Sequence, residues 1–125
     1  MENRILVLDD DPCVLEAIDL SLTYCGFQVR PLLSGQNVFS MIDNFEPHLI
    51  ILDYFLRGED GGEICIKLKS NPLTSKIPVI MLSAHYEVGL KVKQYGYDAF
   101  LPKPFDLFLL INEIKGFINP EPVID

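Results

Sequence analysis

The sequence is poor in several residue types, and their scarcity narrows what the protein can be. It has no tryptophan and three cysteines among its 125 residues. Cys13, Cys25 and Cys65 are odd in number and show no CxxC or other spacing typical of a metal site. We therefore expect reduced, mostly buried thiols and a cytoplasmic location.

Positive charge is also scarce. Lysine and arginine together number 10 against 18 acidic residues, which gives a formal net charge of −8. Direct binding to a nucleic-acid backbone needs clustered lysine and arginine, so this balance argues against it. The same charge suits a metal cation or a protein partner with a basic patch.

Long apolar runs are missing as well. No segment approaches the roughly 20 apolar residues that cross a bilayer. The first apolar segment, residues 5–8, is far shorter than the apolar region of a secretory signal peptide. We therefore expect neither a membrane span nor a cleaved leader.

What the sequence does contain is enough apolar material for one packed domain. Hydrophobic residues make up 49% and charged residues 22% of the chain. A chain of this length buries roughly two-thirds of its unfolded surface when it folds. We expect a single domain over residues 1–119, with residues 120–125 as a tail or the start of a linker.

Short apolar segments alternate with segments of helical periodicity. Strands are expected at 4–8, 27–33, 49–52, 77–82 and 99–101, and helices at 12–25, 35–45, 62–70, 87–95 and 107–117. Such alternation with short connections predicts an α/β fold: a five-stranded doubly wound parallel sheet with five helices. The flavodoxin-like strand order 2-1-3-4-5 is the natural order for five strands.

Polar residues just before the helical segments predict where the helices begin. Asp11, Ser34 and Asp106 are the expected N-caps of the first, second and fifth helices. Phe105 precedes the last cap and can pack on Leu110 as a hydrophobic staple.

The apolar stripes predict which faces of the last two helices are buried. Val88, Val92 and Tyr95 form the stripe of the helix expected at 87–95. The buried face of the last helix is expected to extend to Phe117.

The most informative stretch is the aliphatic run at 49–52, which ends at Asp53 and is followed by a glycine-rich loop over 57–62. Ligands of open parallel α/β sheets bind at the carboxyl ends of the strands, where Asp53 would lie. An isolated aspartate at such a position is more often a loop cap, so Asp53 taken alone favours that interpretation.

Further polar residues follow the other strands. Asp9 and Asp10 come after the first strand, Ser83 after the fourth and Lys103 after the fifth, so all converge with Asp53 on one edge of the sheet. Clustered carboxylates repel one another and need a compensating cation, for which Mg²⁺ is suitable. With a lysine and a hydroxyl beside them, they form a site for a phosphoryl group. An acidic run by itself is more often a helix cap and a turn; the convergence of separate strand ends favours the phosphoryl site.

These motifs together resemble a known family. They are Ile5 to Pro12 (ILVLDDDP), Leu52-Asp53 followed by Gly58 and Asp60-Gly61, Ser83-Ala84, and Phe100 through Phe105. In this order and spacing the chain resembles, from about residue 4 to 117, the receiver domain of bacterial two-component response regulators.

The resemblance implies a role for each residue of the site. Asp53 would be the phosphoacceptor, and Asp9 and Asp10 would hold Mg²⁺ together with the backbone carbonyl of Phe55. Ser83 would donate a hydrogen bond to the phosphoryl group, and Lys103 would pair with its charge. Phe100 would be the aromatic residue that switches position on phosphorylation. The Lys103–Pro104 peptide bond would be cis. Arg57 stands where the family often has proline, which bears on the shape of the loop after Asp53.

The implied function is phosphorylation-controlled signalling without conventional enzymatic turnover. The phosphoryl donor would be a histidine kinase or a histidine phosphotransfer protein, and the response would reach a downstream protein target, an output domain or a phosphorylation-dependent dimer. Two alternatives remain: a small phosphatase with Asp9 as nucleophile and Asp11 as acid, and a degenerate receiver that only docks. The chain is either a stand-alone receiver or one domain of a longer regulator or hybrid kinase.

Overall fold

The computed structural model describes residues 3–56 and 59–118. Arg57 and Gly58, on which part of the expected loop motif depends, lie outside the described residues, as does the segment 119–125 that contains the expected tail.

Strands and helices alternate along the described chain. The strands of the main sheet are β1 (Arg4–Leu8), β2 (Gln28–Leu32), β3 (Leu49–Asp53), β6 (Val79–Ser83) and β7 (Ala99–Pro102). The helices are α1 (Pro12–Tyr24), α2 (Val38–Phe45), α3 (Gly61–Ser70), α4 (Val92–Tyr95) and α5 (Leu107–Phe117), with a 3₁₀ helix η1 (Tyr86–Leu90) before α4. Two short strands that the sequence did not predict, β4 (Phe55–Leu56) and β5 (Glu59–Asp60), pair in antiparallel fashion between β3 and α3.

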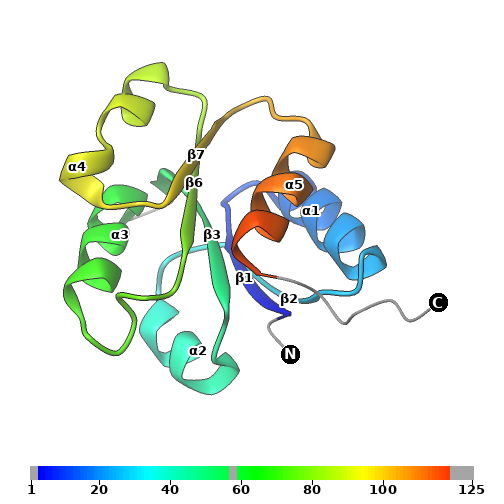
Figure 1. Ribbon diagram of the computed structural model, residues 1–125, viewed down its shortest axis with the longest axis horizontal. Helices are drawn as coiled ribbons and strands as arrows, with labels where there is room; N and C mark the ends of the chain where they lie inside the picture. Colours follow the sequence, from blue (N-terminus) through cyan, green and yellow to red (C-terminus); the bar gives the residue numbers. More distant parts are fainter. Residues whose placement is uncertain (1–2, 57–58, 119–125) are drawn as a thin grey trace.

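The main sheet has the predicted topology. Its strands lie in the order β2-β1-β3-β6-β7, and every neighbouring pair is parallel. In the order in which the main-sheet strands follow one another along the chain, this is 2-1-3-4-5. Helices α1 and α5 cover one face of the sheet, while α2, α3 and α4 cover the other (Figure 1).

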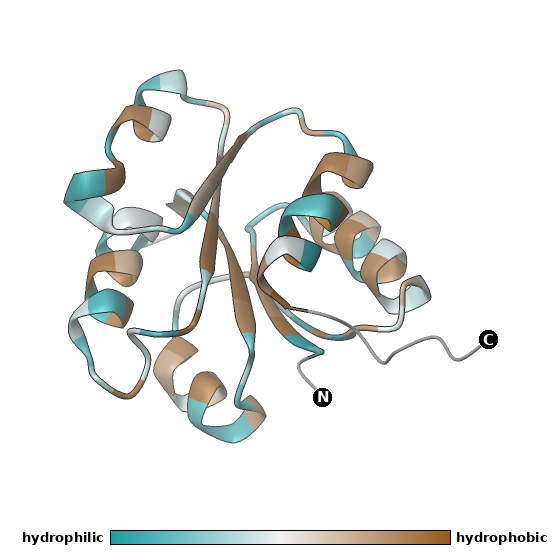
Figure 2. Cartoon of the chain, in the orientation of Figure 1, coloured by the Kyte–Doolittle hydropathy of each residue, from teal (hydrophilic) through white to brown (hydrophobic). Residues whose placement is uncertain are grey.

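The helices enclose the sheet between two apolar layers. Every residue of β3 and β6 is buried, which explains why these segments are continuous apolar runs rather than alternating patterns. Figure 2 shows the inner strands β3 and β6 as largely hydrophobic, while the helices combine hydrophobic and polar residues. None of the helices within the described residues is long and apolar enough to span a membrane.

Two of the three expected N-caps are confirmed. The Asp11 side chain accepts a hydrogen bond from the amide of Cys13 at the start of α1, and Asp106 does the same for Phe108 at the start of α5. Each carboxylate thereby satisfies an amide that has no partner within the helix. Phe105 packs against the apolar cluster that contains Leu110, as a hydrophobic staple requires.

The expected cap at Ser34 is wrong. Helix α2 begins only at Val38, after Asn37 in the left-handed conformation (φ 65°), and its cap makes no side-chain hydrogen bond. The Ser34 hydroxyl instead accepts from the amide of Gln36, 3.3 Å away, because a turn lies between the strand and the helix.

The single fourth helix expected at 87–95 is also wrong, because the chain forms η1 and then one turn of α4. The carbonyl oxygen of Val88 accepts from the amide of Lys91 in 3₁₀ fashion and also from the hydroxyl of Tyr97. In a regular α-helix the Val88 carbonyl would accept from the amide of Val92. The side chain of Val92, which the stripe predicted to be buried, is 46% exposed. The stripe is thus broken, although Val88 and Tyr95 are buried as expected.

One residue of the predicted α5 face is misplaced. Phe117 lies exposed at the end of α5, and Ile118, just beyond the helix, is buried in its place. Leu110 and Ile114 are fully buried, so the expected stripe holds for the rest of the helix.

Candidate functional site

The carboxylates that the sequence placed at the sheet edge come together in the structure. Asp9 follows β1, Asp10 is its neighbour, and Asp53 is the last residue of β3. One carboxylate oxygen from each lies within 4.8 Å of the other two. Asp9 is fully buried and Asp53 is 4% exposed, so the cluster is open to solvent mainly through Asp10.

Local hydrogen bonds and sheet register explain why these side chains meet. One Asp9 oxygen accepts from the amide of Asp11, 3.0 Å away, which fixes the turn between β1 and α1. Leu8 of β1 lies opposite Leu52 of β3, so the residues that follow each of them, Asp9 and Asp53, leave the sheet side by side.

Among the described residues, Lys103 places its positive charge directly against this cluster. Its amine lies 2.7 Å from Asp9 Oδ2 and 3.3 Å from Asp53 Oδ1. It reaches them from the end of β7, where its amide donates to the carbonyl of Ser83. The Lys103–Pro104 peptide bond that follows is cis, as the resemblance implied.

The electrostatics of Asp53 reflect this setting. Burial, followed by the charge of Asp9, raises the pKa of Asp53 from 3.8 to about 6, although Lys103 works in the opposite direction. Burial tends to lower the pKa of Lys103, but its hydrogen bond to Asp9 and the charge of Asp53 outweigh burial and raise it. Lys103 therefore stays charged, while Asp53 carries a charge that its surroundings only partly compensate.

The donor set fits a magnesium ion. Within residues 3–56 and 59–118, three carboxylates converge on one point with one lysine amine among them, so negative charge is in excess there. Hard carboxylate oxygens are the ligands that Mg²⁺ prefers, usually with several waters retained. Asp9, Asp10 and Asp53 would hold the ion.

Ser83 also reaches this edge, as predicted. It is the last residue of β6 and fully buried, and the amide of Tyr54 donates to the carbonyl of the preceding residue, Leu82. The Ser83 hydroxyl accepts from the amide of His85, 3.0 Å away. This contact uses the hydroxyl oxygen as an acceptor and leaves its proton available for donation.

Two aromatic rings lie against each other, one two residues after Asp53 and the other two residues after Ser83. Phe55 is 50% exposed, and its ring centroid lies 4.5 Å from that of His85. His85 in turn lies 3.4 Å from Glu87. Phe100, the expected switch residue, lies on β7, where it packs against the apolar layer on the α3 side and against Gly89 of η1.

The sequence did not reveal the structural roles of Gly61, which belongs to the loop motif, or of the Tyr54 hydroxyl. A side chain at Gly61 would overlap the carbonyl oxygen of Asp53, so this glycine lets α3 begin directly behind the phosphoacceptor candidate. The hydroxyl of Tyr54 pairs with that of Tyr95. The run Gly61-Gly62 was a signal for close approach, but tertiary contacts were needed to interpret it.

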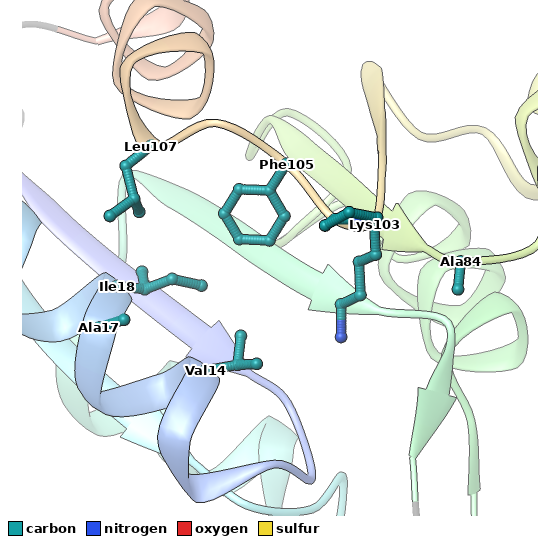
Figure 3. A pocket seen from close by; sticks show the side chains of 8 residues that line it. Val14, Ala17, Ile18, Ala84, Lys103, Phe105 and Leu107 are labelled. Carbon is teal, nitrogen blue, oxygen red and sulfur yellow. The ribbon is translucent and has the colours of Figure 1, made fainter.

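An apolar pocket of about 480 Å³ borders the site on the side of α1 and α5. Figure 3 shows Val14 and Ile18 of α1 facing Phe105 and Leu107 across it, with Lys103 at one end. Lys103 thus lines the pocket and also reaches the carboxylates.

Comparisons with known proteins agree with this geometry. The Response regulator receiver domain family matches residues 5–115. A putative response regulator from Chloroflexus aurantiacus superimposes with a TM-score of 0.87 at 29% identity, covering 94% of this chain and 98% of that one. The BeF3-activated DrrB receiver domain gives a TM-score of 0.81 at 29% identity and covers 94% of this chain and 97% of its own.

Curated relatives are longer than this chain. RpaA, a DNA-binding dual master transcriptional regulator of Synechocystis, is 31% identical over 93% of this chain and 49% of its own length. Response regulator PleD of Caulobacter vibrioides is 32% identical over 100% of this chain and 28% of its own length. The chain thus spans about half or less of these two relatives. From the family match and the shared fold, we conclude that the chain belongs to the response regulator receiver domain family, which serves two-component signalling and is not a class of conventional enzymes.

Proposed function

We propose that this domain accepts a phosphoryl group from a phosphohistidine onto Asp53 and thereby switches a protein-interaction surface. The donor is a histidine kinase or a histidine phosphotransfer protein, and the reaction takes place in the cytoplasm. The observation that carries the proposal is the convergence of Asp9, Asp10 and Asp53 with the Lys103 amine, 2.7 Å from Asp9 and 3.3 Å from Asp53.

The transfer follows from the roles that these side chains can take. An Asp53 carboxylate oxygen attacks the phosphorus in line, the P–N bond to the donor histidine breaks, and the imidazole keeps the electron pair. Lys103 pairs with the oxygens of the transferring group, and the Ser83 hydroxyl donates to one of them. Bound Mg²⁺ would neutralise charge on those oxygens, held by Asp9, Asp10, Asp53 and the backbone carbonyl of Phe55.

The response is proposed to begin at Ser83. When its hydroxyl turns towards the phosphoryl group, it leaves room into which the ring of Phe100 moves. Because Phe100 packs against Gly89 of η1, that movement would reshape the surface formed by η1, α4 and β7. A downstream target protein, an output domain or a second copy of the domain would read this surface.

Intact mass spectrometry tests the phosphoacceptor assignment. The protein is incubated with Mg²⁺ and acetyl phosphate, and we expect the addition of one phosphoryl group. Asp53→Asn should abolish the addition, whereas Asp43→Asn, an exposed carboxylate on α2, should leave it unchanged. If Asp53→Asn is still labelled and Asp9→Asn is not, Asp9 is the nucleophile and the phosphatase alternative replaces this proposal.

A further inference from the structure

A pair of tyrosines links the loop after Asp53 to α4. The hydroxyl oxygens of Tyr54 and Tyr95 lie 2.8 Å apart, one donating to the other, and their ring centroids are 5.5 Å apart. Tyr54 directly follows Asp53, and Tyr95 is the last residue of α4 and 6% exposed. The phosphoacceptor and the end of α4 are therefore joined through one side-chain hydrogen bond.

The start of α3 leaves space for this pair. A Cβ atom at Gly62 would lie 2.5 Å from Cε1 of Tyr95 and 2.9 Å from Cε1 of Tyr54. Atoms at such distances overlap, so a larger residue at this position would push the two rings away. Glycine at position 62 is thus a condition for the hydrogen bond.

The main chain of Tyr54 is fixed on both sides of the loop. Its amide donates to the carbonyl of Leu82 in β6 at 2.9 Å, and its carbonyl accepts from the amide of Gly61 at 2.7 Å. The Tyr54 ring also contacts Phe55 edge-on, with centroids 4.7 Å apart. A shift of the main chain at residues 53–55 would therefore be passed to the Tyr54 hydroxyl rather than absorbed by a loose side chain.

The other end of the link is an element with little stability of its own. Helix α4 has four residues and follows a 3₁₀ helix of five. Helices this short are not stable alone and depend on tertiary contacts. Within the segment 86–96, the buried side chains are those of Val88 and Tyr95. Tyr95 is thus one of two anchors that hold the segment to the domain.

We propose that the Tyr54–Tyr95 hydrogen bond is a latch that couples the state of Asp53 to the conformation of residues 86–96. This inference rests on the proposed function and adds a second connection to the one through Ser83 and Phe100. Phosphorylation displaces the main chain that carries Tyr54, the hydroxyl pair is strained or broken, and the segment anchored by Tyr95 changes its order. The coupling is reciprocal, because whatever holds α4 in place also biases the loop.

Hydrogen exchange of the amides in residues 86–96 tests the latch, with Mg²⁺ and beryllium fluoride as the probe of the phosphorylated state. In the parent we expect the probe to change exchange in this segment at least threefold. Tyr54→Phe and Tyr95→Phe should each reduce that change at least twofold, and the double variant should behave as either single one does. Tyr86→Phe removes a hydroxyl from a tyrosine of the same segment that is 74% exposed; it is the matched control and should respond as the parent does.

Fluorine NMR of the bound probe separates failure of the latch from failure of the proposed function. If all variants bind beryllium fluoride and the segment responds equally in parent and phenylalanine variants, the latch is wrong and the proposed function stands. If the parent does not bind the probe, the proposed function fails and the latch fails with it. Gly62→Ala provides an independent variant, because it leaves both hydroxyls in place and should reproduce the loss of response.

Discussion

At the scale of single residues, the buried charge of Asp53 lowers the free energy of unfolding. A carboxylate that is 4% exposed and close to Asp9 carries a charge that folding disfavours. The proton is therefore held more tightly in the folded protein than in the unfolded chain. The stability gained from this proton is present at low pH and is lost as the pH rises from 3.8 to about 6.

Replacing Asp53 should reveal this cost. At pH 7.5 without metal ions, Asp53→Asn should raise the free energy of unfolding by about 1–3 kcal/mol, since each pKa unit is worth about 1.4 kcal/mol. At pH 4 the difference between variant and parent should nearly vanish, because the folded parent is then protonated. Urea denaturation at both pH values measures the difference in the free energy of unfolding, with Asp43→Asn as the exposed control. A difference independent of pH would exclude the ionisation of Asp53 as its cause.

If Asp53 is the phosphoacceptor as proposed, we expect Phe55, two residues further along the chain, to affect how long the phosphoryl group persists. The ring centroids of Phe55 and His85 lie 4.5 Å apart, and the side chain of Phe55 has no polar atom with which to orient an attacking water. Phe55→Asn should therefore speed the loss of the phosphoryl group by about tenfold, because an amide can position that water. The measurement is decay of the phosphorylated mass after removal of the donor, with Phe108→Asn, on the exposed side of α5, as control. Decay at the parent rate would show that Phe55 does not shield the site.

At the scale of elements, Lys69 joins parts of the fold that the sequence order separates. Its amine donates to the carbonyls of Ser75 and Ile77 and to the carboxylate of Asp98, at 3.2, 2.8 and 2.7 Å. The same Asp98 oxygen accepts from the amide of Val79 at the start of β6. One lysine of α3 thus holds the connection to β6 and the entry to β7 together.

Removing this junction should cost more than removing a surface ion pair. Lys69→Met removes the donor from two carbonyls and the paired cation from Asp98, whose oxygen keeps the amide of Val79, so we expect a loss of about 2–3 kcal/mol in the free energy of unfolding. The matched control is Lys67→Met on the same helix, whose amine is 3.8 Å from Glu59 and whose side chain is 58% exposed. There the loss should stay below about 0.5 kcal/mol. Equal midpoints in urea for both variants would refute the role of Lys69.

At the scale of the whole molecule, the proposed magnesium binding would be linked to folding. The fold gathers Asp9, Asp10 and Asp53 from separate parts of a chain whose net charge is −8. The unfolded chain does not hold these carboxylates together. An ion that binds them therefore stabilises the folded state by mass action, by about 2.7 kcal/mol at a concentration 100 times its Kd.

This linkage predicts a magnesium-dependent shift of the unfolding midpoint. Asp10→Asn should weaken Mg²⁺ binding at least tenfold, which reduces the stabilisation by about 1.4 kcal/mol at saturating metal. Thermal unfolding across a Mg²⁺ titration measures both effects, and Glu113→Gln, an exposed residue of α5, should follow the parent. If Mg²⁺ raises the unfolding midpoint of Asp10→Asn as much as that of the parent, Asp10 is not a metal ligand.

The sequence alone determined the parallel sheet and the composition of its edge. The apolar runs of β3 and β6 are long enough and bounded sharply enough to be recognised, because strands buried on both faces carry no polar residues. Once the strand order follows from the alternation of elements, the edge that collects Asp9, Asp53, Ser83 and Lys103 follows from chain direction alone. The N-caps at Asp11 and Asp106 could be predicted because each side chain bonds to an amide only two residues further along the chain.

Tertiary structure alone decided the features that depend on contacts between distant residues. Ser34 has the chemistry of a cap, yet the path of the chain into α2 placed the helix start at Val38. The segment 86–95 has a helical stripe, but the hydroxyl of Tyr97 takes the carbonyl of Val88 and the helix breaks there. The pairing of Tyr54 with Tyr95 spans 41 positions of the chain, and its existence depends on space left by Gly62. No periodicity or local propensity encodes such contacts, because they arise only when separate elements pack against each other.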